Sequence, residues 1–477
     1  MRFEIFALFD SKTIRSFSFL SFLSFFSIAV FCQAALAQTI AQGPPTGQKG
    51  KPPVIIIPGL IGSELVNKET DEVVWFDLQR SKTDDLRLPI SADLDKNRDN
   101  LVPRDILRNI KYLKFLPETE IYQKLASSLE IPGDYTEGKW DAPGENGFQD
   151  TYYVFPYDWR RDNVENARIL NRRMAELKAK LKRPDLKFNI VAHSMGGLIA
   201  RYAAMYGDTD ALNGTRRPVP TWAGAAHINK IFLVGTPNEG SISSLNALVK
   251  GYALGGGGIN IPFIQSLSKY DMFTLPAIFQ LLPHSGTIRA FDENLKPLKI
   301  DVYNPATWEK YGWAVYDDEK FSKEFTVEEQ AQAKAYFRAV LHRARRFHEA
   351  LDSKINAKSA ISIYLLGSEC KPTLDGMVIY RDEKFRWRTL FDGDEFKRSD
   401  GTKVSGKTVK ELLFAKGDGV VTQRSFLTLT LPGAKTRNGD YRTALPARGI
   451  SFACGVHNEL LSNGEVQNRL FADLISK

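Results

Sequence analysis

Ser194 lies at the centre of the strongest chemical pattern in the sequence. The apolar run 188–191 ends three residues before Ser194, and residues 197–206 after it have the composition of an apolar helix. A strand that enters a small-X-Ser-X-Gly turn and then a helix is a nucleophile elbow, whose tight turn requires small flanking residues. Ala192 stands where the first glycine of this pattern is usual. The pattern therefore predicts a serine hydroxyl exposed above a sheet as a nucleophile.

A serine hydroxyl needs a histidine to take its proton and a carboxylate to orient that histidine. With an elbow of this kind the chain order is serine, acid, histidine. His457 lies just before the last helical stretch, where such a base belongs, and Asp418 lies between Gly417 and Gly419 on a predicted sharp turn. We therefore predict Ser194, Asp418 and His457 as a triad. His193 adjoins the nucleophile, but neighbours at an elbow point apart, so we expect it to pack or to line the site.

Other carboxylates between Ser194 and His457 are weaker candidates for the acid. Asp375 and Asp392 to Asp394 lie in stretches that resemble hairpin turns, where Asp is common. The sequence favours Asp418 over them.

The tetrahedral intermediate of acyl transfer needs two N–H donors for its oxyanion. The amide of Met195, directly after the nucleophile, is the first predicted donor. The second is expected from the turn 58–63, which follows the apolar run 54–57 and contains Gly59 and Gly62. Glycines let the backbone approach a substrate closely, and Leu60 between them is the predicted donor.

The elements that must hold these residues alternate between strands and helices. Five short apolar runs predict buried strands, at 54–57, 152–155, 188–191, 231–234 and 361–366. An amphipathic helix is predicted over 163–182, with a second, more apolar one over 197–206. Such alternation predicts a mainly parallel sheet covered on both faces, and with the elbow it predicts the α/β-hydrolase fold.

Two long segments interrupt the alternation, 78–149 and 238–348, and we interpret both as cap insertions of one domain spanning 52–477. The second contains Gly255 to Gly258, a run that no Lys-Ser or Lys-Thr follows. It therefore indicates a flexible lid, within 238–282, and not a phosphate cradle. An amphipathic helix over 328–351 is expected to close this insertion.

The N-terminus has the pattern of an export signal. Arg2, Lys12 and Arg15 precede an apolar run, 17–31, and the small residues Ala35 and Ala37 follow it. The run is shorter than the ~20 residues that span a bilayer. We therefore predict a signal peptide over 1–37, cleaved after Ala37, then a linker over 38–51 and a periplasmic or secreted enzyme.

Composition excludes several classes of protein. The 477 residues are 43% apolar and 25% charged, as in globular proteins, and loss of 1–37 would lower the net charge from +8 to +7. A basic surface is compatible with anionic lipid head groups, while no basic cluster with interleaved aromatics indicates nucleic acid. Cys370 and Cys454 remain after cleavage and could pair in an oxidising compartment, a question that the sequence leaves open. No zinc-ligand spacing occurs around His227, His284, His342 or His348.

Together these stretches resemble the lecithin:cholesterol acyltransferase family over about residues 53–470. The resemblance rests on residues 57–63 (Ile-Pro-Gly-Leu-Ile-Gly-Ser), 156–160 (Pro-Tyr-Asp-Trp-Arg), 192–197 (Ala-His-Ser-Met-Gly-Gly), 235–240 (Gly-Thr-Pro-Asn-Glu-Gly), 417–420 (Gly-Asp-Gly-Val) and His457, in the family's order. One departure is the disulfide-closed loop that animal members carry after the first strand, since no cysteine lies between Pro53 and Ser368 here.

The resemblance implies a triad of Ser194, Asp418 and His457, transfer of a fatty acyl group from a lipid ester through an acyl-serine, and no cofactor. The acceptor is water or an alcohol. It also implies that Asp158, Trp159 and Arg160 brace the rim of the active site, although a buried salt bridge explains them equally well. The remaining alternatives are a carboxylesterase or thioesterase for non-lipid esters, and a lipid-binding protein without turnover.

Overall fold

The computed structural model describes residues 49–475, except 77–85, 111–118, 253–266, 285, 317, 354–359, 432–433, 435 and 439–440. The predicted signal peptide, most of the predicted linker and the glycine run 255–258 lie outside the described residues. None of the described helices is both long enough and apolar enough to cross a membrane.

A seven-stranded sheet with parallel neighbours forms the centre of the fold, in the order β22-β13-β10-β9-β1-β8-β7. All five predicted strands belong to it: β1 (Val54–Ile57), β8 (Thr151–Val154), β9 (Phe188–His193), β10 (Ile228–Val234) and β13 (Ser362–Gly367). The predicted fold class is thereby confirmed. The edge strands β7 (Thr136–Glu137) and β22 (Ala447–Phe452) were not predicted. Both residues of β7 are exposed, β22 is partly exposed, and neither strand has a continuous apolar run.

The register of the strands brings several loops to one edge of this sheet. Ile57 at the end of β1 pairs with Ala192 of β9, and Ala192 pairs in turn with Leu233 of β10. Val234 pairs with Leu366 of β13. The four strands therefore end side by side, and the segments that follow them begin at the same edge. Ligands of open α/β sheets bind at this carboxyl edge, where the strand order reverses.

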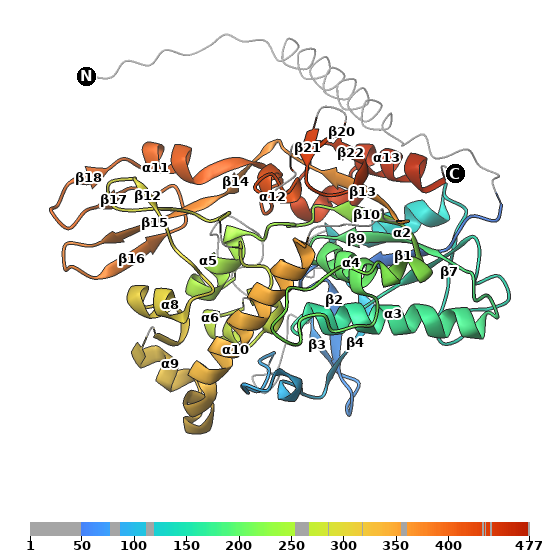
Figure 1. The fold of residues 1–477 in the computed structure, drawn as a ribbon, viewed down its shortest axis with the longest axis horizontal. Coiled ribbons are helices and arrows are strands. Elements are labelled where there is room, and N and C mark those ends of the chain that lie inside the picture. Colours follow the sequence, from blue (N-terminus) through green and yellow to red (C-terminus); the bar gives the residue numbers. More distant parts are fainter. Residues whose placement is uncertain are drawn as a thin grey trace, which may run out of the picture. The chain divides into compact units, whose positions relative to one another are not determined.

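Helices cover both faces because alternate strand residues are buried on opposite sides. Ile55 and Ile57 pack in one cluster with α3 (Asn163–Lys180) and α4 (Met195–Tyr206). Val54 and Ile56 pack in another with α2 (Gln123–Glu130) and α13 (Gly464–Ile475). In Figure 1, α3 and α13 lie on opposite sides of the central strands.

The segment 78–149, predicted to be a cap insertion, contributes to the sheet layers as well. Its strand β7 extends the central sheet and its helix α2 packs on one face. Before α2, a smaller antiparallel sheet combines β3 (Val73–Trp75), β2 (Ser63–Asn67) and β4 (Leu101–Ile106), and β5 (Asn109–Ile110) pairs with β6 (Thr119–Glu120). The segment thus adds one strand and one helix to the central layers.

The described residues of the segment 238–348 are mostly helical. They form α5 (Ile242–Lys250), α6 (Lys269–Phe273), α7 (Pro276–Phe279), α8 (Pro305–Tyr311), α9 (Asp318–Glu324) and most of α10 (Val327–Leu351). Helix α10 begins one residue before the expected start, ends at the expected Leu351, and packs against α4 and α7. A capping box at Thr326 and Glu329 begins it.

A second, mainly antiparallel region combines residues 289–298 with the segment between β13 and Asp418, and it was not predicted. A four-stranded sheet joins β12 (Pro297–Leu298) and β11 (Arg289–Phe291) to β15 (Gly376–Arg381) and β16 (Trp387–Leu390). In it β11 and β15 pair in parallel, and the two outer pairs are antiparallel. The same region contains β14 (Lys371–Leu374), β17 (Phe396–Lys397), β18 (Lys403–Val404), α11 (Gly406–Leu413) and β19 (Phe414–Gly417). Figure 1 shows β15 to β18 and α11 on the left. Most of the region's strands are only two to four residues long, too short to give a clear pattern, while the apolar run 377–380 in β15 was not predicted as a strand.

Candidate active site

Ser194 occupies a strained turn between β9 and α4. Its φ is 53° and its ψ is −124°, values that a residue with a side chain rarely adopts and that cluster at functional sites. Its N–H donates to Val234 O at 2.8 Å, which ties the turn to the end of β10. Helix α4 begins at Met195, directly after the serine and two residues earlier than predicted. The turn therefore has the geometry of an elbow.

The side chain of His457 lies between those of Ser194 and Asp418. Its Nε2 is 2.8 Å from Ser194 Oγ and its Nδ1 is 2.7 Å from Asp418 Oδ2. An ionised carboxylate only accepts hydrogen bonds, so Nδ1 carries the proton and Nε2 can accept the serine hydroxyl. The three predicted residues, distant in sequence, thus form one hydrogen-bonded chain.

Asp418 is held by its own turn, which follows β19. Its Oδ1 accepts the N–H groups of Val420 at 2.9 Å and Val421 at 2.7 Å, and its carbonyl accepts the N–H of His457 at 2.9 Å. Burial by itself would raise the pKa of Asp418. The charge of the His457 imidazolium and these hydrogen bonds outweigh burial and lower the pKa below its ordinary value. The carboxylate therefore stays ionised beside the imidazole.

Gly235, the first residue of the Gly-Thr-Pro block, permits the close contact between acid and base. Its φ is +58°, and a β-carbon there would lie 3.2 Å from both Asp418 Oδ2 and His457 Nδ1. A side chain at this position would push the two apart. The backbone of Gly235 therefore packs directly against the hydrogen bond between Asp418 and His457.

His193 is buried as predicted, and its ring contacts two parts of the site. Its Nε2 is 3.0 Å from the carbonyl oxygen of His457, and its Nδ1 is 3.0 Å from the hydroxyl of Tyr122. Burial lowers the pKa of His193 to about 3, and the nearby charge of His457 contributes in the same direction. The ring is therefore neutral at ordinary pH.

The turn after β1 adjoins the nucleophile. A β-carbon on Gly59 would lie 2.9 Å from the Ser194 β-carbon, so only glycine fits there. Ile61 has a φ of 59°, which is strained for a β-branched residue. The amides of Gly59 and Gly62 already donate, to Tyr122 Oη at 2.8 Å and to Gly59 O at 3.1 Å. Leu60 in this turn and Met195 at the start of α4 therefore remain the predicted oxyanion donors.

Four aromatic side chains bind the backbone of this turn through their polar atoms. The Tyr157 hydroxyl is 2.9 Å from Pro58 O and 3.1 Å from Gly59 O. The indole N–H of Trp75 donates to Ile61 O at 2.9 Å, that of Trp159 donates to Ser63 O at 3.1 Å, and Tyr122 accepts from Gly59. Sequence reasoning missed Trp75 and Tyr122, because neither lies in a motif or near the site in sequence.

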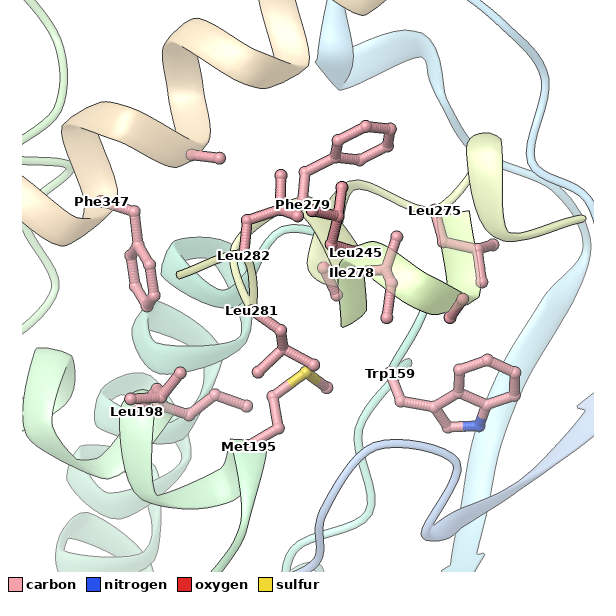
Figure 2. Close-up of a cluster of buried hydrophobic side chains, with 14 of the residues drawn as sticks. Trp159, Met195, Leu198, Leu245, Leu275, Ile278, Phe279, Leu281, Leu282 and Phe347 are labelled. Atoms are coloured by element: carbon pink, nitrogen blue, oxygen red, sulfur yellow. The ribbon is translucent and has the colours of Figure 1, made fainter. Parts of the chain in front are cut away.

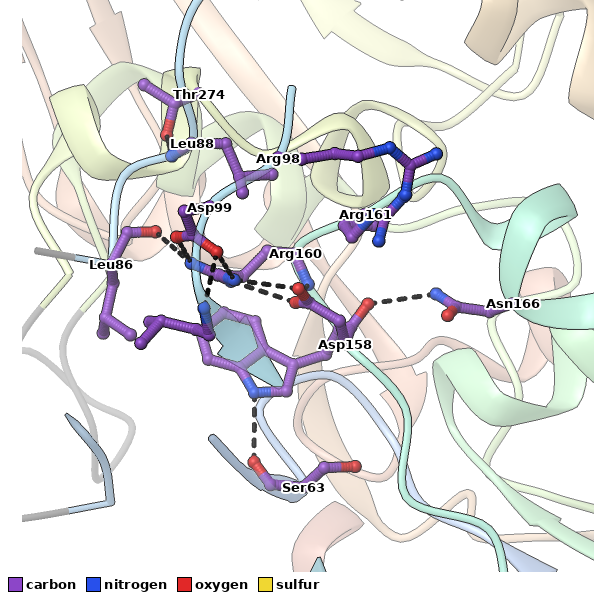
Figure 3. A network of polar contacts seen from close by, with 12 residues as sticks. Ser63, Leu86, Leu88, Arg98, Asp99, Asp158, Arg160, Arg161, Asn166 and Thr274 are labelled. Atoms are coloured by element: carbon purple, nitrogen blue, oxygen red, sulfur yellow. Dashed lines mark hydrogen bonds and ion pairs between the residues drawn. The ribbon is translucent and has the colours of Figure 1, made fainter. Parts of the chain in front are cut away.

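Asp158 and Arg160 lie beneath this turn and are buried. The Arg160 side chain is fully buried, and its guanidinium pairs with Asp158 at 2.8 Å and with Asp99 at 2.6 Å (Figure 3). Asn166 Nδ2 donates to Asp158 O at 3.0 Å. The ion pairs therefore secure the segment that carries Tyr157 and Trp159, as in the buried-salt-bridge alternative.

An apolar cluster lies on the cap side of the elbow. Figure 2 shows Met195 and Leu198 of α4 facing Leu281 and Leu282, which follow α7, and Phe347 of α10. All five are buried or nearly so. The first turn of α4 is thus covered by hydrocarbon.

Cys370 and Cys454, whose pairing the sequence left open, form a disulfide with a Cα–Cα distance of 5.4 Å. Cys454 lies three residues before His457. The bond ties the loop of the base to the segment after β13.

The interpretation of Asp375 as a hairpin-turn residue was wrong. It lies between β14 and β15, which pair with different strands, and its buried carboxylate contacts Arg289 and Arg424.

Among the described residues, no group of three or more His, Cys, Asp or Glu side chains is placed to hold a metal ion. A cavity of about 1040 Å³ between residues 103–109, β8 and α3 is lined by none of the triad.

Comparison with known proteins gives one family. The model of the family described as lecithin:cholesterol acyltransferase matches residues 143–425, a span that includes Ser194 and Asp418. No curated protein is significantly similar in sequence. The solved Tle4–Tli4 complex is similar with a TM-score of 0.52 and 14% identity, covering 90% of this chain and 98% of that chain. The mature Bacillus licheniformis lipase BlEst2 is 12% identical over 91% of this chain and 97% of that chain, with a TM-score of 0.34.

Proposed function

The chain belongs to the lecithin:cholesterol acyltransferase family, and from this membership we propose that it cleaves lipid esters through an acyl-serine formed on Ser194. It is an esterase or acyltransferase that acts on lipid acyl groups. The observation that carries the mechanism is the chain of two hydrogen bonds, 2.8 Å and 2.7 Å long, from Ser194 through His457 to Asp418.

In the first step, His457 Nε2 takes the proton of Ser194 as Oγ attacks the ester carbonyl carbon. Asp418 stabilises the imidazolium that results. The negative charge on the former carbonyl oxygen is bound by the amides of Leu60 and Met195. His457 then gives its proton to the leaving alcohol oxygen, the ester bond breaks, and the acyl group stays on Ser194.

In the second step, His457 removes a proton from water or from an acceptor alcohol, which attacks the acyl-serine. Water yields a free fatty acid and an alcohol yields a new ester. In both cases the proton returns through His457 to Ser194 Oγ.

The proposal includes export of the chain after cleavage near Ala37. The disulfide between Cys370 and Cys454 supports it, because such bonds persist in oxidising compartments. The substrate is a fatty acyl ester. The enzyme meets it at a lipid surface, because its excess of basic residues is attracted to anionic lipid head groups.

The proposal predicts that Ser194→Ala abolishes both ester cleavage and labelling by a fluorophosphonate probe. The serine hydroxyl is the atom that both reactions modify, so a loss of at least about a thousandfold is expected. Thermal unfolding of the variant is the control for folding. Full activity of Ser194→Ala on every ester tested would refute the mechanism.

A series of substrates separates the remaining alternatives. We expect rates to rise with acyl length, and mass spectrometry after incubation with phospholipid and an added alcohol to reveal fatty acid or a new ester. Preference for short or thiol esters would indicate a non-lipid esterase or thioesterase. Lipid binding without labelling of Ser194 would indicate a binding protein.

A further inference from the structure

We infer that Tyr122 is a positioning residue, which joins the oxyanion turn to the loop of the general base through His193. The inference rests on the proposed function and extends it to a residue outside the family's motifs. Tyr122 is 2% exposed and lies at the start of α2, in the first insertion.

Three hydrogen bonds connect these parts in series. The Gly59 amide donates to Tyr122 Oη at 2.8 Å, Tyr122 Oη lies 3.0 Å from His193 Nδ1, and His193 Nε2 lies 3.0 Å from His457 O. One end is the turn that carries Leu60, and the other is the residue that carries the base. His193 itself precedes the nucleophile.

The polarity of this series is fully determined. A carbonyl oxygen only accepts, so His193 Nε2 must carry the proton. In a neutral ring Nδ1 is then an acceptor, so the Tyr122 hydroxyl donates to it. The tyrosine oxygen remains free to accept the Gly59 N–H. Each buried group is satisfied in one arrangement only, and protonation of His193 would leave the tyrosine proton without an acceptor.

Such a series fixes distances that matter in the transition state. Oxyanion donors act only if they lie at the position where charge develops, and a shift of about 1 Å can cost about a hundredfold in rate. Tyr157, Trp75 and Trp159 hold the carbonyls of the same turn, but none of their hydrogen bonds to it reaches the base loop. Tyr122 is the described side chain that binds an amide of the turn and is also linked to His457.

The test compares Tyr122→Phe with Tyr336→Phe in the full chain. Tyr336 in α10 is equally buried, and its hydroxyl has no partner among the described residues. For Tyr122→Phe we expect kcat on a soluble ester to fall roughly ten- to a hundredfold with KM nearly unchanged. Tyr336→Phe should leave both constants unchanged.

A long-chain trifluoromethyl ketone distinguishes positioning from a loss of folded enzyme. Ser194 Oγ adds to its carbonyl carbon, the serine proton passes to His457, and the ketone oxygen becomes an oxyanion. The concentration of functional enzyme is taken from the number of labelled active sites. The Ki of the ketone should then rise in Tyr122→Phe by the same factor as kcat/KM falls. An unchanged Ki with a lower kcat would mean only fewer active molecules, and would overturn the inference.

Two further measurements test the link through His193 directly. In a His193→Ala background, Tyr122→Phe should cost much less than in the native chain, because the link is already broken. In the native chain, 15N shifts should show His193 neutral with its proton on Nε2 at pH 6. A proton on Nδ1 would refute the inference. If Ser194→Ala stays active, the proposed function fails; if it is inactive while Tyr122→Phe is normal, only this inference fails.

Discussion

The two histidines at the site have opposite proton positions. His457 carries its proton on Nδ1, facing Asp418, while His193 carries its proton on Nε2, facing the His457 carbonyl. Their ring centroids are only 4.9 Å apart. One ring can thus change its charge during catalysis beside another that stays neutral, because a second cation at this distance would oppose the imidazolium.

The neutral state of His193 predicts a pH effect on stability. The pKa of His193 falls from an ordinary value of 6.5 to about 3 on folding. Between these values the unfolded chain binds a proton that the folded chain does not, so the free energy of unfolding decreases as pH falls. The decrease from this residue is up to about 1.4 kcal/mol per pH unit.

The measurement is urea unfolding of the native chain and of His193→Gln from pH 7 to pH 4. Gln cannot titrate, so the variant should lose stability more slowly below pH 6.5. Parallel curves for the two proteins would contradict a buried neutral ring.

Among the elements, three hairpins of the antiparallel region share one turn geometry. The turns span 292–296, 382–386 and 398–402. In each, the carbonyl oxygen of the first residue accepts the N–H of the fourth residue, and the N–H of the first residue donates to the carbonyl oxygen of the fifth. The fourth residue of each turn has a positive φ: 61° at Leu295, 57° at Phe385 and 82° at Gly401. Glycine is usual there. Leu295 is compensated by packing against the core, whereas Phe385 is 66% exposed.

We therefore expect Phe385→Gly to raise the free energy of unfolding by about 0.5–1 kcal/mol. A left-handed residue with a side chain costs roughly 1–2 kcal/mol, while glycine loses some of that gain through its greater unfolded entropy. Chemical denaturation checks the value. Leu295→Gly, which also loses packing, should be destabilising, and a destabilised Phe385→Gly would show that Phe385 has contacts that outweigh its strain.

On the scale of the whole molecule, the disulfide joins the base loop to the central sheet across 84 residues of sequence. The intervening chain forms β14 to β22, including the turn of Asp418. Closing so long a loop restricts the unfolded chain, and native disulfides of this kind stabilise by about 2–4 kcal/mol.

The variant Cys370→Ser with Cys454→Ser should therefore lose about 2–4 kcal/mol of stability. Its activity should fall further than that of a surface variant of equal stability, because Cys454 lies three residues before His457. Thermal unfolding and ester cleavage are measured with and without a thiol reductant. The reductant should affect the native chain and leave the variant unchanged; equal behaviour of both proteins would refute the role of the bond.

The sequence by itself determined the fold class, the five inner strands and the triad candidates. These depend on local patterns: a strand buried on both faces is a continuous apolar run, and an elbow needs small residues around its serine. The motifs shared with the family added the order in which the loops that carry the site follow one another along the chain. The edge strands β7 and β22 lack such runs. Most strands of the second, mainly antiparallel region are too short to show one, and the apolar run of β15 does not by itself indicate which strand it pairs with.

Only the tertiary structure decided which distant groups meet. The register of β1 and β9 places the turn after β1 beside His193, where Tyr122, 71 residues before His193, contacts both. Trp75 reaches the same turn from β3, and Tyr157 reaches it from the segment after β8, which pairs with β1. Asp375 and Asp418 have similar sequence surroundings, yet one turns toward two arginines and the other toward His457. The pattern of apolar residues in the sequence indicates which face of a strand is buried. Which distant side chain a loop residue contacts depends instead on the order and packing of the whole sheet.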